Sequence, residues 1–357
     1  MRIRMKALDT LFFRDGKPFS KGEETWSDGI FPPYPSVIYG ALRSAYFSEN
    51  IEIFRSLLES KELNTAKDIS TNARIREISL LVDDKEIFPL PANCLLIKGD
   101  EGKSAQIINK FQEKGISSSA CEYVLKTENQ NYEPVTGGFI TTNVLETYLN
   151  AERKACSIFF DLSQVVNEPK VGIARDSITR IASDSMLYRV DMKRLDKVEL
   201  IVDFEGIELA EKGLLKLGGE GKAISYKVIA EKPIIKLPKI EKEFVMYLAT
   251  PAIFKNGWLP GFIEPDSLNG EIVKGLKVKL KSAIVNRPLL IGGFDMQKKR
   301  AKPMRKAVPA GSLYFFEIEA GSSALLEDSQ GKAMSDFMAE EGFGLTYFGI
   351  TNKEIDN

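Results

Sequence analysis

The sequence of 357 residues contains no histidine. Histidine is the side chain whose unperturbed pKa lies closest to neutrality. Its absence removes the commonest general acid–base group, the Ser–His and Cys–His nucleophile pairs, and the commonest metal ligand. Catalysis would have to depend on Lys, Tyr or carboxylate groups with a shifted pKa or a bound metal. The composition therefore argues against an enzyme, and we expect no resident metal and no cofactor.

Cysteine and long apolar runs are also scarce. Cys94, Cys121 and Cys156 are far apart and form no CxxC pair, which argues against a zinc knuckle and a disulfide framework. No uncharged apolar run approaches the about 18 residues of a membrane span, and the first residues are too charged for a signal peptide. We therefore expect a cytoplasmic protein with reduced thiols.

The net charge offers no general attraction to nucleic acid. Lys plus Arg number 49 and Asp plus Glu number 50, so the formal charge is −1. Any binding of a polyanion has to come from local patches. With 43% hydrophobic residues, the chain is long enough for two domains with cores of their own.

The most informative stretch is the glycine loop, residues 217–222, with the sequence LGGEGK. It is not a nucleotide-binding P-loop, because Lys216 stands where that motif needs glycine and Ala223 stands where it needs Ser or Thr. It is not a dinucleotide fingerprint either, because Ile224 stands where a third glycine or alanine is required. The sequence therefore argues against a mononucleotide or NAD enzyme.

Glycine adopts positive φ without steric cost, so successive N–H groups beside Lys222 are suited to a sugar-phosphate chain. Gly292-Gly293 before Phe294, and residues 342–349, repeat the pattern of glycine next to an aromatic residue. Tight turns at strand ends explain the same pattern. Both interpretations stay open.

The first part of the chain predicts a strand over residues 2–13, which ends at a turn over 14–18, and a helix from Ser36 to about Ser48. Ser36 is the expected N-cap. The helix N-terminus would then direct its amides at the glycine and proline loops, an arrangement suited to phosphate, and Arg43 would add charge.

The next segments predict a helix over Ile51–Glu62 and a β-hairpin formed by 75–82 and 87–90. Asp83-Asp84 at its tip is either an ordinary turn or a pair of metal-binding acids like those of palm-type polymerases and cyclases. Residues 98–150 predict an insertion with a helix near Ser104–Lys114.

Residues 168–194 predict a protruding β-hairpin in which cations and acids alternate. The cations are Arg175, Arg180 and Arg189, and the acids are Asp176, Asp184 and Asp191. Such a hairpin is either salt-bridged in solvent or an RNA contact. A clear strand follows at 198–204.

Residues 230–242 predict a linker before a second unit that begins at Phe244 and contains an amphipathic strand at 276–283. The basic segment, residues 298–306, concentrates positive charge as Lys298, Lys299, Arg300, Lys302, Arg305 and Lys306. It is either a solvated loop or a nucleic-acid surface, and the neighbouring Gly292-Gly293 and Phe294 favour the latter. Residues 307–341 reverse the balance, as expected of a docking face for a basic neighbour.

Several stretches together resemble one family, the Cmr subunit-three proteins of type III-B CRISPR effector complexes in the RAMP superfamily. The stretches are LFFRDGKPF at 11–19, PSVIYGALRSA at 35–45, VGIA at 171–174 leading to MLYR at 186–189, LGGEG at 217–221, KP at 302–303 through AVPAGS at 307–312, and GFGL at 342–345. They occur in the expected order over nearly the whole chain. Roughly residues 98–150 show no resemblance to the family.

The resemblance implies an α+β fold with two ferredoxin-like (RRM-type) domains, insertions and a protruding β-hairpin. The N-terminal domain would cover 1–235, with an insertion near 98–150 and the hairpin near 168–194, and the C-terminal domain would cover 236–357. The implied role is a non-catalytic subunit that grips the repeat-derived 5′ handle of the crRNA. Its partners would be the large cyclase-like subunit and the first backbone RAMP subunit.

The family motifs, the hairpin arginines and Tyr39 define the candidate RNA contacts. They are Arg14, Lys17, Ser36, Tyr39, Arg43, Arg175, Arg189, Gly218, Gly219, Gly221, Lys222, Gly292, Gly293, Lys298, Lys299, Arg300, Lys302, Arg305 and Lys306. Phosphate cradles, cations and stacking planes are the groups that hold single-stranded RNA.

Two enzymatic alternatives remain. One is a metal-independent endoribonuclease that processes CRISPR RNA, with Tyr39, Lys222 or Tyr226 in place of histidine, which the RNA-cutting RAMP proteins often use. The other is a cyclase-like nucleotide site at Asp83-Asp84.

Overall fold

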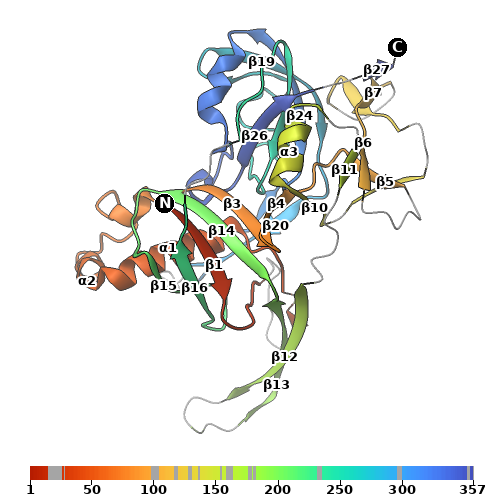
Figure 1. Ribbon diagram of the computed structural model, residues 1–357. Helices are drawn as coiled ribbons and strands as arrows, with labels where there is room; N and C mark the ends of the chain where they lie inside the picture. Colours follow the sequence, from red (N-terminus) through yellow and green to blue (C-terminus); the bar gives the residue numbers. More distant parts are fainter. Residues whose placement is uncertain are drawn as a thin grey trace. The chain divides into compact units, whose positions relative to one another are not determined.

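The computed structural model combines a few helices with many antiparallel strands (Figure 1). It describes all residues except 15–25, 28, 98–103, 116–119, 128–130, 136, 153–154, 158–163, 176–178, 180–181, 231–234, 296–299, 352–353 and 357. The chain forms two compact units. Unit one comprises 1–75, 163–230 and 290–306, and unit two comprises 76–162, 231–289 and 307–357. The predicted contiguous domains 1–235 and 236–357 stay a prediction.

Unit one is built on antiparallel strands in the order β14-β1-β16-β15. Their bounds are β1 (Arg2–Ala7), β14 (Val198–Glu205), β15 (Lys212–Lys216) and β16 (Ala223–Val228). Side chains alternate between the two faces of a strand, so β1 buries Ile3 and Met5 and turns Arg4 and Lys6 to the other face. The predicted strand at 198–204 is confirmed. The predicted first strand is regular only as far as Ala7.

The helices of unit one are α1 (Pro35–Glu49), α2 (Ile51–Glu59) and the 3₁₀ helix η1 (Ile69–Asn72). Both predicted helices are confirmed, with α1 burying Ile38 and Leu42. The N-cap prediction for Ser36 is wrong. Pro35 occupies the first turn, where a missing N–H costs nothing, and Tyr34 is the N-cap residue without a side-chain capping bond.

The predicted hairpin is confirmed as β12 (Val165–Arg175) and β13 (Ala182–Leu195), and β2 (Trp26–Ser27) joins it in parallel with β13. Figure 1 shows the hairpin extending away from β1 and β14. The described part of the basic segment belongs to two short ladders rather than one loop. They are β20 (Leu289–Ile291) with β23 (Arg305–Ala307), and β21 (Phe294–Asp295) with β22 (Arg300–Ala301).

Unit two contains a six-stranded antiparallel sheet in the order β18-β19-β24-β17-β26-β25. The bounds are β17 (Glu243–Leu248), β18 (Asn269–Val273), β19 (Leu276–Ile284), β24 (Leu313–Ala320), β25 (Lys332–Ala333) and β26 (Leu345–Ile350). Its core includes Phe244, whose ring lies 5.3 Å from that of Phe316 and 5.9 Å from that of Phe348. Short 3₁₀ helices η2 (Ser323–Ser329) and η3 (Ala339–Glu341) lie between these strands in sequence. The predicted strands beginning near 244 and at 276–283 are confirmed.

The rest of unit two includes most of the predicted hairpin of β3 (Arg74–Val82) and β4 (Lys85–Pro89), which pairs Val82 with Lys85. β4 also pairs with β10 (Phe139–Thr141), which leads into α3 (Thr142–Leu149). The described part of unit two also contains two small sheets. The first consists of β5 (Cys94–Ile97), β6 (Ser104–Ile107), β9 (Tyr132–Pro134) and β11 (Ala155–Ser157). The second consists of β7 (Lys110–Glu113), β8 (Tyr123–Leu125) and β27 (Glu354–Asp356).

The predicted helix near Ser104–Lys114 is wrong, since this stretch forms β6 and β7. Tertiary packing decides the outcome. Phe111 is fully buried with its ring 5.0 Å from that of Phe315, and β6 pairs with both β5 and β11. In the part of the chain that the structure describes, no helix is long and apolar enough to cross a membrane.

Candidate nucleic-acid interface

Segments far apart in sequence meet at residues 11–14 of unit one. Leu11 and Lys193 exchange backbone hydrogen bonds of 2.8 and 2.7 Å, which joins this segment to the base of the hairpin. The amide of Gly219 donates to the Phe12 carbonyl at 2.8 Å, which joins it to the glycine loop. Phe12 also packs with the hairpin residues Val190 and Met192. The fold therefore brings the predicted glycine loop, the predicted hairpin and the residues leading to Arg14 into one region.

Glycine is required at two positions of the loop for different reasons. Gly218 has a φ of 78°, and a Cβ there would lie 2.3 Å from the Phe12 carbonyl oxygen, so glycine is needed for close packing. Gly221 has a φ of 63° but open space around it, so only its backbone conformation favours glycine. The loop is closed by a bond from the Leu217 amide to the Lys222 carbonyl at 3.0 Å. This geometry supports the interpretation as a tight turn, although residues 218–221 are exposed on their outer side.

Lys222 belongs to a charge cluster, defined here as Asp9, Lys222, Glu168 and Arg194. The Lys222 ammonium donates to the Asp9 carboxylate, and this bond, with a second from the Thr10 backbone, holds the pKa of Asp9 below its usual value. Arg194 Nε lies 2.6 Å from Glu168 Oε2 and lowers the pKa of Glu168. The two cations thus face two acids, and a phosphate has to compete with a carboxylate for Lys222.

Arg43 of α1 is engaged within unit one. Its Nη2 lies 2.8 Å from Oδ2 of Asp68, and its Nε donates to the Ser70 hydroxyl at 2.9 Å. Asp68 is fully buried, and its other oxygen accepts from the Ser70 backbone at 3.0 Å. The guanidinium also lies 5.7 Å from the centre of the Tyr39 ring, which is itself buried. Arg43 therefore ties α1 to η1, while Ser36 remains half-buried at the start of the helix.

The other predicted arginines differ in their surroundings. Arg14 is exposed and forms an isolated bridge with Gly29. Arg189 is partly buried, with its Nε 3.9 Å from Oδ1 of Asp191 on the same strand, as expected of a salt-bridged hairpin. Arg175 is paired with Ala182 near the end of the hairpin. The predicted contacts Lys17, Lys298 and Lys299, as well as Arg180, lie outside the described residues.

The basic segment presents its cations to solvent. Arg300, Lys302, Arg305 and Lys306 are all exposed. The amide of Lys302 donates to the Gly293 carbonyl at 2.9 Å, so the Gly292-Gly293 turn lies beside the lysine. Within the described ranges, no ion pair involves Arg300, Lys302 or Lys306. These cations keep their charge available for a polyanion.

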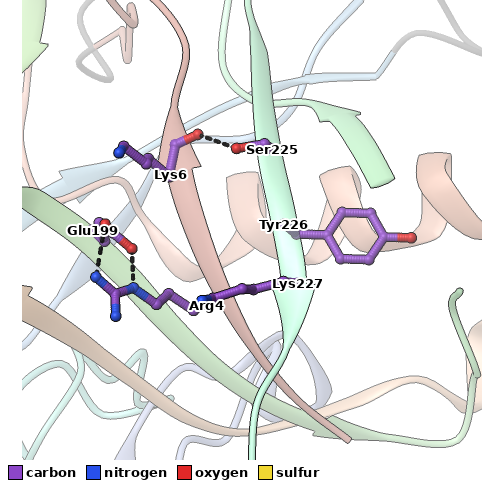
Figure 2. Close-up of a pocket in the computed structure, with 6 residues that line it drawn as sticks. All are labelled: Arg4, Lys6, Glu199, Ser225, Tyr226 and Lys227. Carbon is purple, nitrogen blue, oxygen red and sulfur yellow. Dashed lines mark hydrogen bonds and ion pairs between the residues drawn. The ribbon is translucent and has the colours of Figure 1, made fainter. Parts of the chain in front are cut away.

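One cationic surface of unit one was missed at the level of sequence. A cavity of about 280 Å³ lies on the sheet and is lined by Arg4, Lys6, Glu199, Ser225, Tyr226 and Lys227 (Figure 2). The alternation of cations with apolar residues in Arg2-Ile3-Arg4-Met5-Lys6 was a visible signal. The register with β16 is what shows that Lys227 lies beside Arg4.

The groups required by the enzymatic alternatives are poorly suited to acid–base work. The Tyr226 hydroxyl donates to Glu49 Oε1 at 2.9 Å, and burial together with this carboxylate raises the pKa of Tyr226 to about 12. A general base works best with a pKa near the operating pH. Asp83 and Asp84 both have positive φ in the β3–β4 turn, which is the ordinary turn interpretation. Among the residues described, no group of three or more Cys, Asp or Glu side chains is placed to hold a metal ion.

Comparison with known proteins gives two kinds of match. A family model described as CRISPR-associated protein (Cas_Cmr3) matches residues 3–351. A cryo-EM structure of the type III-B Cmr-beta bound to cognate target RNA and AMPPnP contains a chain with 16% identity and a TM-score of 0.51, covering 88% of this chain and 86% of that one. A second, bound to cognate target RNA, contains a chain with 16% identity and a TM-score of 0.51, covering 96% and 94%. No curated protein matches the sequence.

Proposed function

The chain belongs to the Cas_Cmr3 family of CRISPR-associated proteins, and from this premise we propose that it is a non-catalytic, RNA-binding subunit of a type III-B effector complex. It grips the 5′ repeat-derived handle of the crRNA, in the cytoplasm, during RNA-guided defence. The similar solved chains come from type III-B complexes bound to target RNA, which supports the proposal. Its two domains are ferredoxin-like in this proposal, and the antiparallel sheet of unit one with α1 on one face is compatible with that.

The observation that carries the proposal is the exposed positive charge of three cations in the basic segment. Arg300, Lys302 and Lys306 are exposed, and no ion pair of the described residues neutralises them. Neutralising RNA phosphates with such cations releases condensed counterions, which is the main source of affinity for a single strand. A Cβ at the adjacent Gly293 would lie 3.4 Å from the Lys302 side chain, which is an ordinary contact, so the cations rather than this glycine support the proposal.

The glycine loop contributes in a second way. It packs on Phe12 through Gly218 and Gly219 and presents Lys222 beside Asp9. In the proposed complex a handle phosphate replaces the Asp9 carboxylate at the Lys222 ammonium. This exchange is modest in energy because both groups are anions and the Asp9 side chain is exposed to solvent.

The acidic part of unit two is the proposed docking face for a neighbouring subunit, either the large cyclase-like subunit or the backbone RAMP subunit. Glu319, Glu327, Asp328 and Glu340 are exposed there. Glu317 is not part of this surface, because it pairs with Lys242 at 2.6 Å and Lys281 at 3.5 Å. Complementary charge at such a surface steers association and fixes register.

The test compares two variants of the full-length chain, each with four cations changed to alanine. The test variant carries changes at Arg300, Lys302, Arg305 and Lys306, and the control carries changes at Lys255, Lys274, Lys277 and Lys332, which are exposed in unit two. We expect the test variant alone to bind crRNA more weakly. Its plot of log affinity against log salt should be shallower by about 0.7 for each phosphate that the variant no longer neutralises.

Equal affinities and salt slopes for the two variants would contradict the proposal. The same incubation in EDTA also tests the endoribonuclease alternative, because the proposed scaffold leaves the RNA intact. Cleavage that disappears in a Lys222→Ala variant would favour the enzyme instead.

A further inference from the structure

The sheet face of unit one carries a row of cations placed directly opposite one another. Arg4 on β1 is the register partner of Lys227 on β16, and Lys227 is the partner of Lys212 on β15. Register partners project from the same face of a sheet, so three cations lie side by side across three adjacent strands. Lys6 and Lys216 belong to the same face, as the partners of Ser225 and Ala223. We call these five residues the basic sheet face.

Without a ligand, this row of cations destabilises the sheet, because like charges directly opposite on neighbouring strands repel each other. One acid relieves part of this cost. Arg4 Nη2 donates to Glu199 Oε1 at 2.9 Å, and Figure 2 shows this pair lying beside Lys227. In the part of the chain that the structure describes, neither Lys227 nor Lys212 belongs to an ion pair. A sheet that retains such a row is expected to have an anionic ligand that neutralises it.

The composition of the face distinguishes between possible ligands. Among the described residues that line the cavity, Tyr226 is the aromatic one, and its ring points away from Arg4 and Glu199 (Figure 2). The residue is 3% exposed and its hydroxyl reaches Glu49 of α1, so it offers no stacking plane for a base. Protein interfaces favour aromatic side chains and are depleted in lysine. The basic sheet face is rich in lysine, which favours a phosphate backbone over a protein partner.

We propose that the basic sheet face, which adjoins the glycine loop at Lys216, binds the phosphate backbone of single-stranded RNA without reading its bases, in addition to the contacts proposed for the glycine loop and the basic segment. This inference rests on the proposed function, because it takes the RNA of the effector complex as the ligand. The row Arg4–Lys227–Lys212 crosses two strand spacings, about 10 Å. That length exceeds a single phosphate group and suits consecutive phosphates of one strand.

The test is a full-length variant with Lys6, Lys212, Lys216 and Lys227 changed to alanine, which leaves the Arg4–Glu199 pair in place. The probes are crRNA and an unrelated single-stranded RNA of equal length, each titrated over a range of salt. We expect both RNAs to bind more weakly by a similar factor, with the salt slope shallower by about 0.7 for each phosphate left without its cation. We also expect the thermal midpoint to stay the same or rise, since the variant removes repulsion within the sheet.

The unit-two control variant, with changes at Lys255, Lys274, Lys277 and Lys332, serves again and should bind both RNAs normally. Unchanged RNA binding by the sheet variant, alongside weakened binding by the basic-segment variant, would overturn this inference and leave the proposed function intact. Normal binding by both variants would overturn both. A loss confined to crRNA would show base recognition, and full competition by inorganic phosphate would show a small-anion site; either result contradicts a backbone contact.

Discussion

The glycine loop and the basic segment look alike in sequence but differ in how their charge is balanced. Beside the glycine loop, Lys222 bonds to Asp9, and Arg194 lies 2.6 Å from Glu168. In the basic segment, Arg300 and Lys302 are exposed and have no ion-pair partner among the described residues. A cation next to glycine is therefore weak support for polyanion binding until the acids around it are known. Cations of the first kind have to leave an acid before they bind a phosphate, whereas those of the second kind are available to a ligand without that exchange.

The largest expected effect concerns Arg43, which, like Lys222 and Arg194, is paired with an acid of the same chain. Changing Arg43 to alanine leaves the buried Asp68 carboxylate without its cation, which is expected to lower the free energy of unfolding by about 3 kcal/mol. Urea denaturation measures the change. The matched control, Arg300→Ala, removes an exposed cation and should change stability by no more than about 0.5 kcal/mol. If Arg43→Ala kept wild-type stability but weakened RNA binding, Arg43 would belong with the basic segment.

A smaller effect is expected at the glycine loop itself. Gly218→Ala combines a positive φ with a Cβ placed 2.3 Å from the Phe12 carbonyl oxygen, so the unfolding free energy should fall by about 2 kcal/mol or more. Gly221→Ala is the control. It has the same backbone constraint but open space, and it should cost about 1 kcal/mol. Equal midpoints in urea for the two variants would show that packing on Phe12 does not explain the geometry of the turn.

The smallest expected effect comes from removing the carboxylate of Asp9, to which Lys222 donates. Asp9→Asn removes the competing carboxylate, so crRNA affinity should rise by about twofold, whereas Asp266→Asn, at an exposed acid of unit two, should leave it unchanged. A fall in affinity for Asp9→Asn would mean that Asp9 positions Lys222 for RNA rather than competing with it.

The same pair predicts a pH dependence with a definite sign. Because the bond from Lys222 holds the pKa of Asp9 below its usual value of 3.8, the pair contributes stability above that pH and loses it as the pH falls through the folded-state pKa. An NMR titration of the Asp9 carboxyl in the Lys222→Ala variant should show the pKa returning towards 3.8.

Local patterns were sufficient to predict much of the fold. The β3–β4 hairpin, α1 and the β12–β13 hairpin each have an apolar period or a turn signal within their own sequence. The prediction of a helix at 104–114 was wrong because the conformation of this stretch depends on distant partners. β6 pairs with β5 and β11, and Phe111 packs on Phe315. Helix and strand propensities are easily overridden by such packing.

The candidate site was predictable only as a set of cations. The sequence identifies Lys222 as basic, but the acid that balances it, Asp9, lies 213 positions away. Similarly, the alternation in β1 shows Arg4 and Lys6, while the row with Lys227 and Lys212 exists only through the register of three strands. Charge compensation is a property of tertiary structure, so the compensated and uncompensated regions could not be told apart beforehand.

The carbonyl of Phe12 and the pairing of Leu11 with Lys193 connect a small turn to a long lever arm. β12 has 11 residues, which at about 3.4 Å each correspond to roughly 37 Å of strand. Because residues 11 and 12 bond both to the glycine loop and to the base of the hairpin, any displacement of the loop acts on the same segment that anchors the hairpin.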